Sequence, residues 1–306
     1  MIREYCKIGI NHHLLFPGVL DDPHYHERSL YALLIDGYFD IIDMSLPDDA
    51  AVRMEEIKML KSFGKTIIYN FPLFCLSSNE FDLNSLSKKV RERTLGEAKK
   101  HLEYAAAAGA KTVTFASGVY RFDMPEEEQL KGFIEYSVAF NEAAKALGIT
   151  ALLEPFDRSI GKNLLLGKVD LCVAYIEALR SAGCENIALM QDMAHIPLIG
   201  EDFAYTLQKS KPYLFHIHLG NCVMRDPKNP YYGDTHPPIG IDGGENDMDE
   251  LIEFTRALKD IGYLYKGGHN SVTFEMQPYP GASSLTSAKL AAEKFETALN
   301  NVYNQK

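Results

Sequence analysis

Four residues in the second half of the chain have the types and spacing of a metal-binding catalytic site. Glu154, Asp192, His218 and Glu275 each stand at the end of a short apolar run, in the stretches ITALLE, NIALMQD, YLFHIH and SVTFE. Buried carboxylates are unfavourable unless they are paired or bound to a metal. Three carboxylates and one imidazole form a mostly oxygen site, which suits Mn²⁺, Mg²⁺ or Co²⁺. We expect these residues to bind one divalent cation; the alternative is that some are ordinary polar residues facing water.

These residues need elements that bring them together, and short apolar runs alternate with helical patterns through the whole chain. The runs are continuously apolar, which indicates parallel strands covered on both faces. We expect strands at residues 7–11, 39–45, 66–71, 112–117, 150–154, 187–192, 214–219 and 272–276. Eight strand-then-helix units predict an α/β protein with a single (β/α)8 TIM barrel over residues 1–306, in which catalytic residues collect at the carboxyl ends of the strands.

Four helical patterns support this arrangement, at residues 86–108, 126–147, 170–182 and 247–261. A glycine follows each one, as is typical of a helix end. A doubly wound open sheet is the alternative fold. The chain has no G-x-G-x-x-G after the first strand and no G-x-x-x-x-G-K-[ST], which disfavours the nucleotide-binding form of that sheet.

Composition excludes several classes of partner. The net charge is −11 with no basic cluster, which argues against nucleic acid and anionic membrane surfaces as partners. No apolar run is long enough to span a bilayer or to serve as a signal peptide, so we predict a cytoplasmic protein. The cysteines form no C-x-x-C pair, which argues against a disulfide framework and a structural zinc. They are Cys6, Cys75, Cys172, Cys184 and Cys222.

Longer stretches around the four residues carry a resemblance to a known family. LLEPFDR, MQDMAH, HIHLGN and FEMQP resemble the xylose isomerase-like TIM-barrel superfamily of sugar phosphate isomerases and epimerases. The resemblance implies a metal held by Glu154, Asp192, His218 and Glu275. Two departures stand out. Gly220 and Asn221 follow the HIHL run, where many relatives have a Lys-Asp pair. Phe156 stands where some relatives have a polar residue or His, so a catalytic base is not expected there.

A narrower resemblance lies in the block HIHLGNCV…DP…YYGDTHPPIG…GGEND. It is similar to the catalytic subunit of bacterial C-glycoside-deglycosylating enzymes. This resemblance implies a 3-keto-glycoside substrate, Mn²⁺ as the favoured metal and a small β-rich partner subunit. A homo-oligomer is a further expectation for the assembly.

Four residues are candidates for catalysis. The resemblance implies that Glu154 and Glu275 flank the substrate carbon, one removing a proton and the other returning it, although both could be ligands only. His195 could bind a substrate oxygen, act as an acid or base, or orient Asp192. His236 could be a general acid, or could fix the geometry of its loop. His216 is expected to pack inside the barrel or support the ligands.

Substrate contacts are expected from three regions. The segment 221–247 is long for a strand-to-helix connection, which favours a lid or binding loop. Each candidate could instead be a surface or anchoring residue. The candidates are Asn11 and His12 (with His13 beside them), Arg158 (with Lys162 nearby), Arg225 and Tyr232.

Three functions remain open on these residues. The first choice is a lyase that forms an enediolate next to a keto group and cleaves the C- or O-glycosidic bond of a 3-keto-glycoside by β-elimination. The second is an aldose–ketose isomerase or ketose 3-epimerase, which shares the early steps. The third is a non-catalytic sugar-binding partner subunit, which has no need of two glutamates at a metal. A DNA-repair endonuclease would need more ligands and a basic face.

Overall fold

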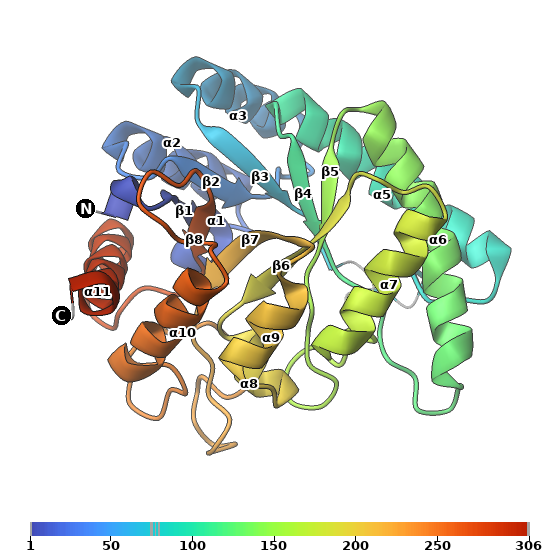
Figure 1. The fold of residues 1–306 in the computed structure, drawn as a ribbon. Helices are drawn as coiled ribbons and strands as arrows, with labels where there is room; N and C mark the ends of the chain where they lie inside the picture. Colours follow the sequence, from blue (N-terminus) through green and yellow to red (C-terminus); the bar gives the residue numbers. More distant parts are fainter. Residues whose placement is uncertain (1, 74–75, 77, 79, 305–306) are drawn as a thin grey trace.

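Eight parallel strands close into a barrel in chain order, which confirms the predicted (β/α)8 TIM barrel (Figure 1). The structure is a computed structural model that describes residues 2–73, 76, 78 and 80–304. β1 pairs with β8 from Lys7↔Ser271 to Ile10↔Phe274 and so completes the ring. The strands are β1 (Lys7–Asn11), β2 (Ile41–Met44), β3 (Thr66–Asn70), β4 (Thr112–Phe115), β5 (Thr150–Leu153), β6 (Ile187–Asp192), β7 (Leu214–Leu219) and β8 (Ser271–Phe274).

Helices follow the strands and surround the barrel (Figure 1). The short η1 (Ile2–Glu4) precedes β1, and the short α1 (His12–Leu15) follows it. The other helices are α2 (Pro23–Asp36), α3 (Ala50–Phe63), α5 (Lys88–Ala108), α6 (Glu126–Ala146), α7 (Val169–Ser181), α8 (His195–Ile199), α9 (Phe203–Ser210), α10 (Met248–Asp260) and α11 (Ser284–Asn304). Within the described ranges, none of these helices has the length and apolar character needed to cross a membrane.

Helix ends follow the sequence signals closely. Gly109, Gly148, Gly183 and Gly262 all adopt positive φ, between 67° and 89°, as the sequence predicted for glycines that end helices. The helices α2 and α3 were not located from the sequence. An aspartate directly precedes the first turn of each helix. The carboxylates of Asp22 and Asp49 accept hydrogen bonds from backbone N–H groups of the first helical turn.

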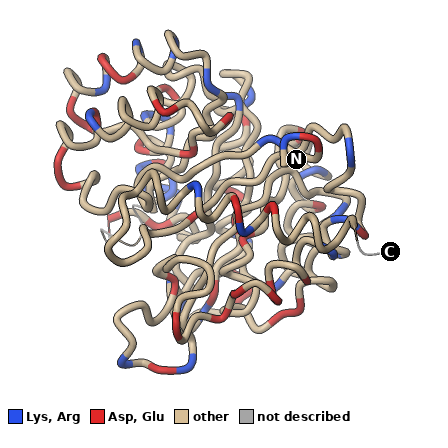
Figure 2. The backbone as a smooth tube through the Cα atoms, turned by 90° about the vertical axis from the view of Figure 1, so that its left-hand side faces the viewer, with Lys and Arg blue, Asp and Glu red and all other residues tan. Residues whose placement is uncertain are grey.

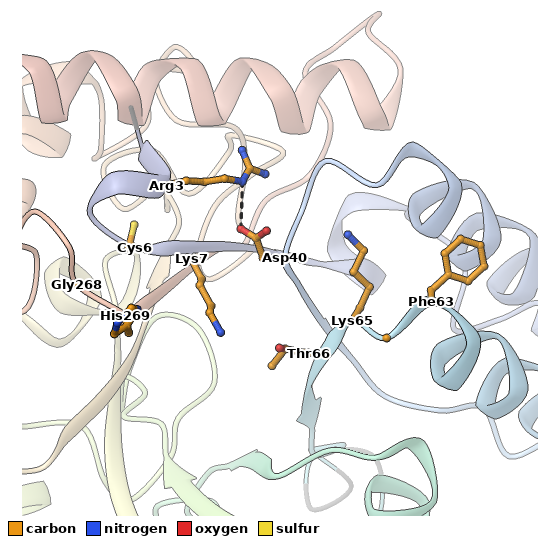
Figure 3. Close-up of a pocket in the computed structure, with 10 residues that line it drawn as sticks. Arg3, Cys6, Lys7, Asp40, Phe63, Lys65, Thr66, Gly268 and His269 are labelled. Atoms are coloured by element: carbon orange, nitrogen blue, oxygen red, sulfur yellow. Dashed lines mark ion pairs between the residues drawn. The ribbon is translucent and has the colours of Figure 1, made fainter.

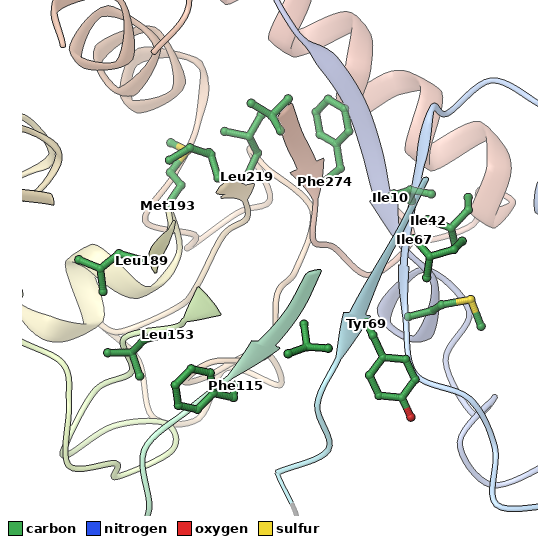
Figure 4. Packing of buried hydrophobic residues seen from close by; sticks show 14 of the residues in the cluster. Ile10, Ile42, Ile67, Tyr69, Phe115, Leu153, Leu189, Met193, Leu219 and Phe274 are labelled. Atoms are coloured by element: carbon green, nitrogen blue, oxygen red, sulfur yellow. The ribbon is translucent and has the colours of Figure 1, made fainter. Parts of the chain in front are cut away.

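Alternate side chains of each strand face the helices and form the main hydrophobic core (Figure 4). Phe115 of β4 meets Phe140 of α6 with ring centroids 5.1 Å apart, and Phe274 of β8 meets Phe295 of α11 at 6.1 Å. Burial of each such side chain contributes about 1.5–3 kcal/mol. This layer packs the helices against the strands and so sets where the strand ends lie.

The remaining strand residues face the barrel interior, where space is limited. A Cβ atom at Gly9 would lie 2.5 Å from Thr273 Oγ1 and 2.9 Å from Ile41 Cβ, so only glycine fits. Thr273 Oγ1 in turn lies 3.0 Å from His216 Nε2. His216 is fully buried beneath His218, and its other ring nitrogen is 2.8 Å from Ser271 Oγ.

Charged residues of both signs are interspersed along the backbone in the view of Figure 2, without a basic face on that side. The four described cysteines, Cys6, Cys172, Cys184 and Cys222, are free and buried. Cys75 lies outside the described residues.

Candidate active site

The four candidate ligands converge at the carboxyl ends of the strands. One ligand atom from each of Glu154, Asp192, His218 and Glu275 lies within 4.8 Å of all the others. His218 Nδ1 is 3.7 Å from Glu154 Oε1 and 3.6 Å from Asp192 Oδ2, and it contacts Glu275 Oε2 directly. All four side chains are buried. The sequence-predicted set is therefore assembled in space.

Strand register explains this convergence. Asp192 at the end of β6 is paired with His218 of β7, after a register shift at Leu189 and Met190. Glu154 and Glu275 come directly after β5 and β8. Side chains two residues apart on a strand face the same side. The inward polar residues at the strand ends thus form a ring: Asn11, Asp43, Asn70, Thr114, Glu154, Asp192, His218 and Glu275.

The ring gives the site a strongly negative interior that fits a divalent cation. Although burial opposes it, the charges of Glu275 and Asp43 raise the pKa of His218 well above its usual range. The same negative charges that favour a proton on the buried imidazole also attract a metal ion. Glu154 Oε1 has no hydrogen-bond partner in the structure. A buried, unpartnered carboxylate oxygen facing an imidazole and two more carboxylates matches a site for an oxygen-preferring metal.

The carboxylates differ in how readily they ionise. Burial and then the charge of Glu275 raise the pKa of Glu154 to about 8. Burial also acts on Asp192, but His195 and hydrogen bonds from His218 and His236 hold its pKa well below the usual range. Perturbed pKa values of this kind cluster at functional sites.

A cavity of about 630 Å³ opens over the site. Glu154 and Glu275 line it, whereas Asp192 and His218 lie behind them and are fully buried. Of the four candidate ligands, the two glutamates are thus the ones that face the space where a substrate would bind.

Two histidines and one aspartate form a second group at the cavity wall. Asp234 Oδ1 lies 3.2 Å from His195 Nε2 and 3.2 Å from His236 Nδ1, while Asp234 Oδ2 lies 3.3 Å from Lys162 Nζ. Burial opposes protonation of both rings, but the charge of Asp234 raises the pKa of His195 to about 10 and that of His236 to about 8. The ring of Phe156 packs 4.3 Å from that of His195.

The segment 221–247 brings His236 and Asp234 to this group and is fixed at its ends. Asn246 Nδ2 donates to Gly220 O at 2.9 Å and to Met193 O at 3.2 Å, and Asn221 Nδ2 donates to Pro238 O at 3.0 Å. His236 adopts a φ of 53°, which is uncommon for a residue other than glycine. Backbone strain of this kind often marks a functional position.

The three residues at and after the end of β1 lie in different surroundings. Asn11 Nδ2 donates to Glu275 Oε1 at 2.9 Å, so it supports a candidate ligand. His12 lies away from the cavity, because its Nε2 is 2.8 Å from Ser29 Oγ on α2. Its neighbour His13 lines the cavity instead.

The three other expected substrate contacts are not brought to the cavity. Arg158 donates to Leu165 O and to Glu126 Oε2, with its guanidinium over the ring of Tyr120. Arg225 is 75% exposed and pairs with Glu245. Tyr232 forms an isolated bridge with Val223. None of these three residues is among those that line the cavity.

Asp43 is the principal site residue that the sequence reasoning missed. Its Oδ2 lies 2.8 Å from His218 Nε2, on the ring nitrogen that does not face the other carboxylates. Burial raises the pKa of Asp43 to about 6. A polar residue inside the apolar run 39–45 was the available signal. Asp234, in the segment 221–247, was assigned no role from the sequence.

A second hollow of about 500 Å³ lies at the opposite end of the barrel, around the starts of β1 and β3 (Figure 3). Two of the three Lys and Arg residues that line it have local partners: Arg3 Nε is 3.5 Å from Asp40 Oδ2, and Lys65 Nζ donates to Phe39 O and Gly37 O. Active sites of TIM barrels lie at the carboxyl ends of the strands. The hollow is therefore distinct from the candidate active site.

A comparison of the sequence with known protein families identifies the family of this chain. Residues 36–296 match the family described as xylose isomerase-like TIM barrel, and the chain belongs to this family. A curated protein of Haemophilus influenzae, named as an L-ribulose-5-phosphate 3-epimerase, is 26% identical over 136 residues. This match covers 40% of the chain and 47% of the relative, so it spans about half the relative's length.

Several solved structures share the whole fold. A structure titled L-ribulose 3-epimerase superposes with a TM-score of 0.71 at 20% identity, over 97% of this chain and 96% of that one. D-psicose 3-epimerase of Clostridium cellulolyticum gives 0.64 at 18% identity, over 97% and 98%. The 3-keto-D-glucoside 4-epimerase of E. coli gives 0.62 at 15% identity, over 98% and 100%. At these identities the likeness establishes the barrel fold.

Proposed function

We propose that the chain is a divalent-metal-dependent sugar epimerase or isomerase that moves a proton at a carbon next to a keto group. One observation carries this proposal. Four candidate ligand atoms lie within 4.8 Å of one another, and the glutamates among them, Glu154 and Glu275, also line the cavity. The similar structures are named as sugar epimerases, and these names support the same function. The comparisons thus favour the second of the functions expected from the sequence over the lyase.

The proposed cation is held by Glu154, Asp192, His218 and Glu275, with Mn²⁺ as first choice among Mn²⁺, Mg²⁺ and Co²⁺. A bound divalent cation polarises a substrate oxygen and so makes the adjacent C–H group more acidic. Asp43 accepts a hydrogen bond from His218 Nε2 and directs Nδ1 toward the carboxylates.

The two glutamates are the proposed proton carriers. Glu154 lines the cavity, and its Oε1 has no hydrogen-bond partner, so this carboxylate oxygen is free to take a proton. Glu275 is oriented by Asn11, which donates to its Oε1, and a carboxylate fixed in this way can return a proton at a defined position. In this proposal, one glutamate removes a proton from the substrate carbon and the other supplies one.

Two histidines are proposed to bind the substrate. His195 donates from Nδ1 to Pro155 O at 3.0 Å, which leaves Nε2 on the side of Asp234 and the cavity. His236 lies between Asp234 and Asp192, with its Nε2 3.4 Å from Asp192 Oδ2. Protonated imidazoles at these positions are proposed to donate hydrogen bonds to sugar oxygens that become negative during the reaction, His195 through Nε2, which lacks a hydrogen-bond partner, and His236 in exchange for one of its two carboxylate contacts.

A lyase acting on 3-keto-glycosides is the second candidate. The long segment 221–247, which belongs to the block resembling C-glycoside-deglycosylating enzymes, brings His236 to the cavity, where it could protonate a leaving group. The first proton abstraction is common to both reactions. A small β-rich partner subunit is proposed only with this second function.

Incubation of the Mn²⁺-loaded protein in D₂O, read by mass spectrometry, tests the proposal. Ketoses and a 3-keto-glycoside are supplied in parallel. Deuterium in an epimerised or isomerised sugar supports the proposed function. Free aglycone without an isomerised sugar favours the lyase. Unchanged substrates with no deuterium, although the protein holds the metal, contradict both.

A further inference from the structure

The connection that follows β5 is wound around one buried carboxylate. Asp157, three residues after the candidate ligand Glu154, is 1% exposed. Its two oxygens accept hydrogen bonds of 2.5–3.0 Å from four consecutive backbone N–H groups. The donors are Ser159, Ile160, Gly161 and Lys162. Hydrogen bonds to a charged acceptor are strong, so these contacts stabilise one conformation of residues 157–162, which we call the Asp157 turn.

The Asp157 turn packs closely against the segment 221–247. At Gly161, a Cβ atom would lie 2.7 Å from Asp234 Cβ. Gly233 has a φ of 92°, and a Cβ atom there would lie 3.3 Å from a backbone oxygen of the turn. Glycine at both positions lets the two connections approach each other at the wall of the cavity.

Lys162 links the two connections through its charge. Its Nζ lies 3.3 Å from Asp234 Oδ2 and donates a hydrogen bond to Asp234 O at 3.3 Å. The side chain of Asp234 is 1% exposed, and neither of its carboxylate oxygens accepts a hydrogen bond from the described residues. A buried carboxylate of this kind depends on ionic partners. Among the described residues that line the cavity, Lys162 is the one Lys or Arg.

Asp234 in turn lies between the two imidazoles of the cavity wall. Its Oδ1 is 3.2 Å from His195 Nε2 and 3.2 Å from His236 Nδ1. A carboxylate in contact with an imidazole sets the orientation of the ring. Lys162, Asp234 and the two histidines line the cavity, whereas Asp157 does not. Asp157 can therefore act on a substrate only through the residues that it positions.

We propose that Asp157 and Lys162 are positioning residues for the reaction. Asp157 holds the turn, Lys162 holds Asp234 by charge, and Asp234 directs both imidazoles toward the substrate oxygens. The inference rests on the proposed function for what the imidazoles do. It assigns the charge of Lys162 to a carboxylate of the protein, and not to a hydroxyl or phosphate group of the substrate.

A double-mutant cycle on the Mn²⁺-loaded protein tests whether Lys162 acts through Asp234. The rate measured is deuterium exchange from D₂O into D-psicose, the ketose in the name of one similar structure. We expect Lys162→Met and Asp234→Asn each to lower kcat by about 10–100-fold, the usual effect of removing a residue that orients a site residue. KM should change little, because the imidazoles act on charge that develops during the reaction. The double variant should be no slower than Asp234→Asn alone.

Three further variants separate positioning from other effects. Lys162→Arg keeps the cation and should restore most of kcat. Lys168→Met, on the same connection, is the matched control and should change nothing, because its Nζ contacts Gly200 O away from the cavity. Asp157→Asn should lower kcat without reaching the cavity; the cycle at Lys162 does not depend on whether this variant folds. Mn²⁺ affinity should be equal in all these variants, since none replaces a candidate ligand.

The orientation of the imidazoles can also be followed without turnover. In Mg²⁺-loaded protein labelled with ¹⁵N-histidine, Lys162→Met should shift the ring nitrogen resonances of His195 and His236. Lys168→Met should leave these resonances in place. This measurement requires no knowledge of the substrate.

Unchanged ring resonances in Lys162→Met, or losses of kcat that multiply in the double variant, overturn the inference. A raised KM with unchanged kcat in Lys162→Met also overturns it, because Lys162 would then bind the substrate directly. Shifted resonances in a protein that exchanges deuterium into no ketose would retain the positioning of the imidazoles and remove the epimerase. Deuterium exchange that does not respond to Lys162→Met would do the reverse.

Discussion

Asp43 Oδ2 lies 2.8 Å from Nε2 of His218, while Nδ1 of the same ring faces the carboxylates of Glu154, Asp192 and Glu275. A histidine that donates one N–H to a carboxylate keeps the lone pair of its other nitrogen directed at the metal position. The arrangement fixes both the tautomer and the orientation of the ring. Asp43 is fully buried, so solvent does not compete for this hydrogen bond.

Asp43→Asn should lower the affinity for Mn²⁺ by about 10–100-fold, because the amide is a weaker acceptor than the carboxylate and carries no charge. Metal competition with a chelating dye measures the affinity. Asp40→Asn, at the other end of the barrel, is the matched control and should bind the metal like the unmodified protein. Equal affinity in both variants would mean that Asp43 does not support the ligand.

Glu154→Gln and Glu275→Gln should each lower the rate of deuterium incorporation by about 10²–10⁴-fold, the usual contribution of a general acid or base. Circular dichroism should show an intact fold. Asp192→Ala and His218→Ala should instead reduce the metal content, since these residues lie behind the cavity wall. Glu253→Gln on the exposed face of α10 is the control. Full activity of both glutamine variants would refute the proposed proton carriers.

Stabilisation by the metal should grow with pH. In the metal-free protein the pKa of Glu154 is raised to about 8, above its ordinary value of 4.5. The folded state therefore favours the protonated carboxyl, and this stabilisation is lost as the pH rises toward 8. A metal requires the carboxylate, so at low pH it must displace this proton. The rise in Tm on adding Mn²⁺ should be larger at about pH 8 than at about pH 6.

Glu154→Gln provides the control for this pH dependence. A glutamine does not titrate, so the metal-induced change in Tm should depend less on pH in this variant. An identical pH profile in the two proteins would assign the dependence to another group. Differential scanning fluorimetry at matched ionic strength is sufficient for the comparison.

Glu56→Ala should lower the free energy of unfolding by about 3–5 kcal/mol, the usual effect of removing one partner from a buried pair. Glu56 Oε1 lies 2.6 Å from His26 Nδ1, and both side chains are buried between α2 and α3. Burial raises the pKa of Glu56. The neighbouring Glu55, which is exposed, provides the control variant Glu55→Ala. Urea unfolding curves measure both; equal stability would show that the pair contributes nothing.

The barrel could be predicted from the sequence because its signals are local. Continuous apolar runs marked the strands, and the ends of β1, β6 and β7 were predicted at the observed residues. Glycines marked the ends of helices through their backbone freedom. The four converging site residues were found because each ends such a run, and consecutive parallel strands place their ends together.

Side-chain direction could not be predicted in the same way. His12 and His13 are adjacent at a strand end, yet His12 lies within hydrogen-bonding distance of Ser29 on α2 whereas His13 lines the cavity. Asp43 meets His218 across 175 residues of sequence. A single sequence contains no signal that predicts such a long-range contact. Arg158 and Arg225 were assigned by charge, whereas local carboxylates and carbonyls decide where they lie.

The hydrogen bond from Asn11 to Glu275 joins residues 264 positions apart and crosses the seam where β8 meets β1. Asn11 belongs to the first strand and Glu275 follows the last, so this contact exists only when the seam between β8 and β1 is closed. Long-range pairing of this kind forms late, since the entropy of loop closure must be overcome first. The orientation of Glu275 by Asn11 is therefore a product of barrel closure, whereas the four candidate ligands themselves come from the consecutive strands β5 to β8.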